Sequence, residues 1–212
     1  MEVFTLVLEL IGTVSFAASG AMVAVRKRMD VFGVIILGIV TAVGGGVIRD
    51  MLLGITPPVM FQNPLYALVA AATAAVVFIP AVRRFANRET HHREIAALIT
   101  DSVGLGIFAV VGVQAGILAG HGDNLFFIVF LGSVTGVGGG VLRDVMAVTK
   151  PYIFVKHVYA LAAIAGALVC ALLWKILGST LSMLLGTAVV IALRLLAAKF
   201  KWSLPKAVPE EE

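Results

Sequence analysis

The sequence predicts an all-α membrane protein with seven transmembrane helices. Of its 212 residues, 60% are hydrophobic and only 13% are charged, and the mean hydropathy is +1.06. A soluble domain carries about 25% charged residues, so this chain lacks the polar side chains that would cover a water-soluble globule. Disordered chains are poor in apolar residues and rich in charge, which excludes disorder. The single cysteine, Cys170, excludes a disulfide framework.

Seven apolar segments are long enough to cross a bilayer, which takes about 20 residues in a helix. Polar or glycine-containing separators divide them, such as Arg26-Lys27-Arg28 after the first and Gly178-Ser179 between the last two. The first segment is too long for the apolar region of a signal peptide, so we interpret it as a retained span. The segments cover residues 3–25, 31–54, 64–82, 95–119, 125–148, 157–174 and 179–199.

Basic residues gather on one side of these segments. Twelve of the 16 Lys and Arg residues fall in alternate loops and in the C-terminal tail, whereas the opposite side holds Lys175 alone. Loops rich in Lys and Arg face the cytoplasm. The sequence therefore predicts a multi-pass protein of the cell (inner) membrane, with its N-terminus outside and its C-terminus cytoplasmic. An even number of spans would destroy this asymmetry.

The chain contains an internal repeat. Residues 44–50 read Gly-Gly-Gly-Val-Ile-Arg-Asp and residues 138–144 read Gly-Gly-Gly-Val-Leu-Arg-Asp, and flanking residues match at offsets of 92 to 94. Each copy has three spans, an odd number, so the second copy must insert upside down, which places functional sites near the midplane. We expect a first repeat with its loop at 1–92, a second, inverted repeat at 93–175, a seventh helix at 176–200 and a cytoplasmic tail at 201–212.

Each repeat carries a glycine triplet, Gly44, Gly45 and Gly46 in the first and Gly138, Gly139 and Gly140 in the second. Glycine costs a helix about 1 kcal/mol relative to alanine, and close packing explains one glycine per turn rather than three in a row. Loosened backbone at membrane depth is tolerated where it lines a cavity. The triplets therefore predict that helices 2 and 5 are kinked there, with carbonyl groups facing a pathway; close packing is the alternative.

An Arg-Asp pair follows each triplet: Arg49-Asp50 in the first repeat and Arg143-Asp144 in the second. Charged side chains inside spans are costly and indicate a function or an internal partner. Adjacent residues on a helix point about 100° apart, so we expect each Arg to pair with an Asp from elsewhere in the chain. The two pairs would bracket a central constriction; a purely structural ion-pair clamp is the alternative.

Hydroxyl side chains at membrane depth complete the candidate pathway. Hydroxyl groups can coordinate a partly dehydrated cation, although they also bond back to their own helix. The sequence holds no zinc-ligand spacing and no Ser/His/Asp set at membrane depth, so it predicts no enzyme, no cofactor and no tightly bound metal. The hydroxyl candidates are Ser15, Ser19, Thr41 and Thr135.

The seven spans, the three-plus-three repeat and the doubled Gly-Gly-Gly-Val-[Ile/Leu]-Arg-Asp motif resemble the prokaryotic trimeric intracellular cation channels over about residues 1–200. The resemblance implies a homotrimer in a lipid membrane, with one pore per protomer for permeant K⁺ or Na⁺ lined by helices 2 and 5 at the triplets. Nucleic acid is not an implied partner. The same bacterial sequences are also described as a glycine-transporter domain, so a secondary transporter of glycine or a similar small solute is the alternative.

Overall fold

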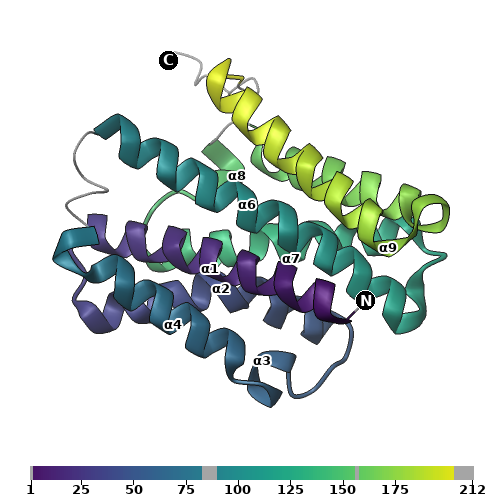
Figure 1. Cartoon of the computed structure of the whole chain (residues 1–212), viewed down its shortest axis with the longest axis horizontal. Helices are drawn as coiled ribbons and strands as arrows, with labels where there is room; N and C mark the ends of the chain where they lie inside the picture. The colour runs from purple at the N-terminus through teal and green to yellow at the C-terminus, as the bar shows by residue number, and fades with distance from the viewer. Residues whose placement is uncertain (1, 83–89, 156–157, 203–212) are drawn as a thin grey trace, which may run out of the picture.

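The computed structural model describes residues 2–82, 90–155 and 158–202, and the protein is helical (Figure 1). Among these described residues, five helices are long and apolar enough to cross a membrane. These are α1 (Glu2–Arg26), α2 (Val31–Leu52), α6 (Thr90–Gly116), α7 (Leu125–Met146) and α9 (Tyr159–Lys199). The shorter elements are α3 (Val59–Gln62), α4 (Leu65–Phe78), the π-helical turn η1 (Ile117–His121) and α8 (Tyr152–Val155).

The helices pack as two similar groups. Helix α1 lies against α2 and α4, while α6 lies against α7 and α9, and the groups meet where α2 contacts α7 and α1 contacts α6. Phe16, Leu105 and Tyr159 belong to the buried core. Large apolar side chains also cover the outside, for example Phe126, which is 81% exposed. An outer surface this apolar suits contact with lipid chains rather than with water.

Helix α9 is two arms joined at Gly178. Its 41 residues would measure about 62 Å as one straight helix, about twice the hydrocarbon thickness of a bilayer. Gly178 has φ 75° and ψ 172°, a backbone conformation open to glycine because it has no Cβ. The two arms therefore turn back and lie side by side (Figure 1). The separator expected at Gly178-Ser179 is confirmed.

Helix α4 is shorter than the expected segment at 64–82. It ends at Phe78 because Pro80 cannot donate a backbone hydrogen bond and disfavours the helical conformation at the residue before it. Ile79 accordingly has φ −57° and ψ 130°, and helical structure resumes at residues 80–82. With 14 residues, α4 is shorter than the segment of about 20 residues that spans a bilayer.

The sequence repeat is also a repeat of local structure. Helices α2 and α7 each have 22 residues. An acceptor side chain caps both N-termini: Asp30 Oδ1 accepts from Gly33 N at 2.7 Å, and Asn124 Oδ1 accepts from Phe127 N at 3.0 Å. Because both caps and both helix ends lie 94 positions apart in the sequence, the same local signals start and stop the two helices.

The glycine triplets lie where α2 crosses α7, and both helices continue through them. Every residue of α2 and α7 is α-helical, so the unwinding that the sequence predicted is absent. A Cβ atom on Gly45 would overlap the Thr135 carbonyl oxygen, and one on Gly139 would overlap the Thr41 carbonyl oxygen. The backbones thus touch directly, as the packing interpretation of the triplets requires.

The same crossing explains why single glycines do not suffice. Besides the backbone contact, Gly44 faces the Leu142 side chain and Gly138 faces the Ile48 side chain. Ile48 and Leu142 are equivalent positions of the two repeats, so the contacts are reciprocal. Consecutive glycines are needed because each helix receives both a backbone and a side chain of the other within one turn.

We therefore expect Gly45→Ala and Gly139→Ala to destabilise the protein, because overpacking a tight contact costs about 1–3 kcal/mol. Thermal unfolding in detergent should show a melting temperature several degrees below that of the parent. Gly46→Ala is the matched control, since the nearest atom to its added Cβ is Arg49 Nη2 at 3.9 Å. Equal melting temperatures for all three variants would refute the packing role.

Candidate functional site

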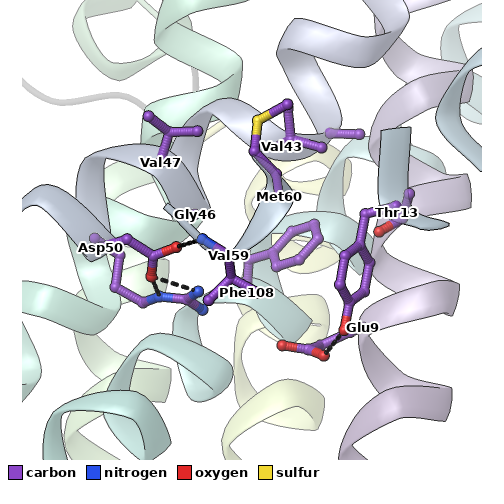
Figure 2. A pocket seen from close by; sticks show the side chains of 12 residues that line it. Glu9, Thr13, Val43, Gly46, Val47, Asp50, Val59, Met60 and Phe108 are labelled. Carbon is purple, nitrogen blue, oxygen red and sulfur yellow. Dashed lines mark hydrogen bonds and ion pairs between the residues drawn. The ribbon is translucent and has the colours of Figure 1, made fainter. Parts of the chain in front are cut away.

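A cavity of about 670 Å³ opens beside the N-terminal half of α1. It continues into a narrower pocket, because Glu9, Arg49, Asp50 and Tyr66 line both spaces. The narrow part extends past Thr13 and Gly46 to the ring of Phe108 (Figure 2). We call the combined space the Glu9 cavity.

The Arg49–Asp50 pair closes on itself at the wall of this cavity. Arg49 Nε donates to Asp50 Oδ1 at 2.8 Å, and Arg49 Nη2 lies 2.7 Å from the same oxygen. The other carboxylate oxygen, Oδ2, accepts from Val59 N at 2.9 Å and so fixes the start of α3 (Figure 2). The expectation that Arg49 pairs with a distant Asp is wrong, because its long side chain folds back onto its neighbour.

Glu9 is a second carboxylate in this cavity. Its Oε2 accepts a hydrogen bond from Tyr66 Oη at 2.5 Å. Glu9 and Asp50 together outnumber Arg49, so the charged lining residues carry one negative charge in excess. Sequence reasoning singled out neither Glu9 nor Tyr66.

A second space opens at the other end of α1. One part, of about 350 Å³, is lined by Val23, Arg26, Lys27, Asp144, Thr149 and Tyr152. A neighbouring part shares Arg26 and Tyr152 and adds Glu94 and Arg194. We call the two parts together the Arg26 cavity. Its described charged lining residues carry one positive charge in excess, unlike those of the Glu9 cavity: Arg26, Lys27 and Arg194 against Glu94 and Asp144.

A buried ionic cluster closes the inner end of the Arg26 cavity. Arg143 Nη1 lies 2.6 Å from Asp101 Oδ1 and 2.7 Å from Ser19 Oγ, while its Nε donates to Asp144 Oδ1 at 2.8 Å. Arg143 is 0% exposed and Asp101 is 1% exposed. The expectation of a distant Asp partner is confirmed for Arg143, although this Arg also pairs with its own neighbour.

Helix α9 contributes a second cation to this cluster. Arg194 Nη2 lies 3.5 Å from Asp101 Oδ2, and its guanidinium stands 4.7 Å from the centre of the Tyr159 ring. Asp144 Oδ2 accepts from Tyr152 N at 2.9 Å, which fixes the start of α8 as Asp50 fixes α3. Buried charges require such partners, because an uncompensated buried ion is strongly destabilising.

Between the two cavities lie the helix crossing and a pair of aromatic rings. The rings of Phe16 and Phe108, equivalent residues of the two repeats, are 5.4 Å apart. Thr41 Oγ1 donates to Leu37 O at 2.5 Å and Thr135 Oγ1 donates to Leu131 O at 2.6 Å. Both threonine hydroxyls therefore bond back to their own helices.

The other predicted residues take distinct places. Gly46 lines the narrow pocket, whereas a Cβ on Gly140 would lie 2.8 Å from Tyr159 Oη in the ionic cluster. Ser15 is half-buried and is not among the described residues that line the Glu9 cavity or the Arg26 cavity. Asp101 is not among the site residues predicted from the sequence, and its partnership with Arg143 became visible in the structure.

Comparison with known proteins places the chain in a family. The sequence profile of the glycine transporter family matches twice, at residues 6–81 and 98–175. The UPF0126 inner membrane protein YadS of Escherichia coli K12 is 36% identical over 208 residues, which are 96% of each chain. The chain belongs to this UPF0126 family. Another member, the UPF0126 membrane protein YvgT of Bacillus subtilis, is 34% identical and covers 93% of this chain and 94% of its own.

Solved structures extend the comparison. The fold matches "Crystal structure of a prokaryotic TRIC channel in 0.5 M KCl" with a TM-score of 0.87 and 29% identity, covering 96% of this chain and 100% of that one. It matches a TRIC trimeric intracellular cation channel orthologue from Rhodobacter sphaeroides with a TM-score of 0.84 and 33% identity, covering 93% and 98%. This UPF0126 protein is thus a multi-pass membrane protein with a TRIC-like fold, and its family is not an enzyme family.

Removing the shared carboxylate of the ionic cluster should destabilise the protein strongly. Asp101→Asn leaves Arg143 and Arg194 without their common negative partner, and breaking a buried pair in this way costs about 3–5 kcal/mol. We expect a large fall in melting temperature or loss of the folded peak in size-exclusion chromatography. Asp101→Glu, which keeps the charge, should recover part of the loss.

Asp123→Asn is the control for that measurement. Asp123 pairs with Lys175 at 3.0 Å, but its side chain is 97% exposed, and exposed pairs contribute little. Its melting temperature should equal that of the parent. If Asp101→Asn also melted like the parent, the cluster would not be the stabilising centre described here.

Proposed function

We propose that this UPF0126 protein is a passive channel for monovalent cations, K⁺ or Na⁺, with one pore in each protomer of a homotrimer. The observation that carries the proposal is the pair of cavities that open at opposite ends of α1 and approach each other within one protomer. The likeness to solved TRIC cation channels over nearly the whole chain supports it.

One face of α1 orders the residues along the proposed pore. Glu9, Thr13, Phe16, Ser19 and Val23 recur every three or four residues, so they lie in one row about 21 Å long. The first two line the Glu9 cavity and the last lines the Arg26 cavity. Phe16 and Ser19 lie between them, where they contact Phe108 and Arg143.

Two contacts block the proposed path. The Phe16 and Phe108 rings form an apolar constriction, and the Arg143 guanidinium occupies the path and repels cations. Conduction therefore requires Arg143 to leave Asp101 and Ser19. Among the residues predicted from the sequence, we assign Gly46, Arg49 and Asp50 to one mouth. Ser19, Arg143 and Asp144 belong to the other mouth, and Gly140 lies beside Arg143 in the ionic cluster. The wall at the crossing is formed by Gly44, Gly45, Gly138, Gly139, Thr41 and Thr135.

The charge of the Glu9 cavity favours cations. An acidic mouth with low-dielectric walls raises the local concentration of cations and excludes anions. The Glu9 cavity carries this excess negative charge, whereas the described lining of the Arg26 cavity carries one positive charge in excess. We assign the selection of cations over anions to the Glu9 side of the pore.

We also propose seven spans in an inverted three-plus-three repeat with an outside N-terminus. The reciprocal contacts at the crossing and the double match of the family profile support the repeat, and the two arms of α9 supply spans six and seven. Several of the basic residues that predict the orientation lie outside the described residues: Arg83, Arg84, Arg88, Lys156 and Lys206.

A secondary transporter of glycine or a similar small solute is the second candidate. Two observations favour it: the family profile is that of a glycine transporter, and the narrow pocket presents the Glu9 carboxylate and the Arg49 guanidinium together. Opposite charges of this kind suit a zwitterion. A transporter with alternating access would show no unitary currents, whereas a channel passes ions fast enough to resolve single openings.

The orientation is tested by thiol labelling in a Cys170→Ala background. Cysteines introduced at positions 123, 88 and 206 should react differently with a membrane-impermeant reagent applied to intact cells. Position 123 should react from outside, and positions 88 and 206 only after the membrane is opened. Reaction of 88 and 123 from the same side would contradict the seven-span arrangement.

The function is tested by recording purified protein in planar bilayers under a KCl gradient. We expect unitary currents that reverse near the K⁺ equilibrium potential. Asp50→Asn removes one negative charge from the Glu9 cavity and should move the reversal potential toward zero by reducing the preference for cations over anions. Asp123→Asn, which changes the same charge outside the cavities, should leave the reversal potential unchanged.

If no unitary currents were seen and the protein took up glycine, the channel proposal would be refuted in favour of the transporter. Currents whose reversal potential is the same in the parent and in Asp50→Asn would place the selective region elsewhere.

A further inference from the structure

Each repeat contributes four side chains to one mouth of the proposed pore, and the four occupy equivalent positions in the two repeats. Each set contains a carboxylate from the first helix of its repeat, an Arg-Asp pair from the second and a tyrosine that follows. We call them the first set and the second set. The first set is Glu9, Arg49, Asp50 and Tyr66, and the second is Asp101, Arg143, Asp144 and Tyr159, at offsets of 92, 94, 94 and 93.

Part of the geometry is the same in both sets. The Arg Nε donates to the Asp that follows it at 2.8 Å in each case. The second oxygen of that Asp accepts a backbone N–H at 2.9 Å, from Val59 in the first set and from Tyr152 in the second. The Arg-Asp pair is therefore a fixed element of each set.

The partner of the first-helix carboxylate, Glu9 or Asp101, differs between the sets. In the second set, Arg143 Nη1 reaches Asp101 at 2.6 Å, and Tyr159 Oη has no hydrogen-bond partner among the described residues. In the first set the tyrosine holds the carboxylate instead, since Tyr66 Oη donates to Glu9 at 2.5 Å. The carboxylate thus has two alternative partners, Arg or Tyr, and each set shows one of them.

The two arrangements have different consequences for the path. In the second set, where Arg143 contacts the Asp101 carboxylate, the side chains are buried and block the mouth: Arg143 is 0% exposed. With the Tyr on the carboxylate, the first set lines a cavity of about 670 Å³. Arg contact therefore accompanies a closed mouth, and Tyr contact accompanies an open one.

We propose that the first set is a second gate, seen here in its open arrangement, in which Tyr66 keeps Glu9 away from Arg49. The gate closes when Arg49 captures Glu9 and displaces the Tyr66 hydroxyl. This inference rests on the proposed conducting path. By the same exchange, Tyr159 Oη is the group that receives Asp101 when Arg143 withdraws to open the other mouth.

The chemistry of the guanidinium allows this exchange without breaking the Arg-Asp pair. Arg has five N–H donors, and Arg143 already uses Nε for Asp144 and Nη1 for Asp101. Arg49 can act in the same way toward Asp50 and Glu9. Space beside it is available, because Gly46 has no side chain and a Cβ there would lie 3.9 Å from Arg49 Nη2.

Arg194 explains why the two sets are not in the same arrangement. It reaches Asp101 at 3.5 Å from the arm of α9 that follows Gly178, and this arm lies outside both copies of the repeat. The second set therefore contains an additional cation that draws its carboxylate into the buried cluster, and the first set has no equivalent position.

The experiment is a double-mutant cycle on Glu9 and Tyr66, recorded as open probability in planar bilayers. Tyr66→Phe removes only the hydroxyl that holds Glu9. Because a hydrogen bond to a charged group is worth about a tenfold change in an equilibrium constant, we expect open probability to fall, by up to about tenfold. Glu9→Gln removes the charge that Arg49 would capture, so open probability should not fall.

The double variant decides the proposal. In the Glu9→Gln background, Tyr66→Phe should have no further effect, because no carboxylate is left for Arg49. If Tyr66→Phe lowered open probability equally in both backgrounds, or raised it in the parent, the second gate would be refuted.

A second readout does not depend on conduction. In a Cys170→Ala background, Thr13→Cys lies one turn deeper than Glu9 in the narrow pocket, and its reaction with a water-soluble thiol reagent reports whether the mouth is open. Tyr66→Phe should slow this reaction by up to about tenfold, and adding Glu9→Gln should restore it. If the protein conducts no ions but the thiol rates follow this pattern, the channel function fails while the gate stands. Unchanged rates would remove the gate itself.

Discussion

The direct backbone contact between α2 and α7 is the constraint on which the rest of the structure depends. Because Gly45 and Gly139 have no side chains, a threonine carbonyl group of the other helix packs directly against each of them. This contact fixes the relative positions of the two repeats. It also places Arg49 and Arg143, each four residues beyond its glycine, on opposite sides of the crossing, and so determines where the two cavities lie.

The buried charges follow from that placement. A guanidinium at membrane depth needs a charged or polar partner, and each Arg pairs with the carboxylate next to it in the sequence. Each of these carboxylates also holds a backbone N–H at the start of a short helix, α3 or α8. The same side chains therefore stabilise the chain reversals that follow α2 and α7 and line the mouths of the proposed pore.

Much of this architecture is visible in the sequence. Hydropathy located the long helices, the doubled motif identified the repeat, and Gly178 marked the turn inside α9. The early end of α4 at Phe78 was not predicted, although Pro80 indicates it. The helices run unbroken through the triplets because interhelical contact, which hydropathy does not report, compensates the helix cost of glycine.

The site was less accessible to sequence reasoning. The Arg-Asp pairs were found, but the reach of the Arg49 side chain back to its neighbour depends on rotamers and on the Val59 amide. Glu9 and Asp101 carried a signal that could have revealed them: they align at an offset of 92, as Phe16 and Phe108 do. Arg194 had no such signal, because the helix that carries it lies outside the repeat.

The central claim is that ions pass through each protomer between the Glu9 cavity and the Arg26 cavity. The most direct test is covalent block of Val43→Cys, which lines the narrow pocket, by a bulky thiol reagent during recording in a Cys170→Ala background. One pore per protomer of a trimer predicts that the current of a single trimer falls in three equal, irreversible steps. Complete modification of this cysteine without loss of current would show that ions cross the protein by another route.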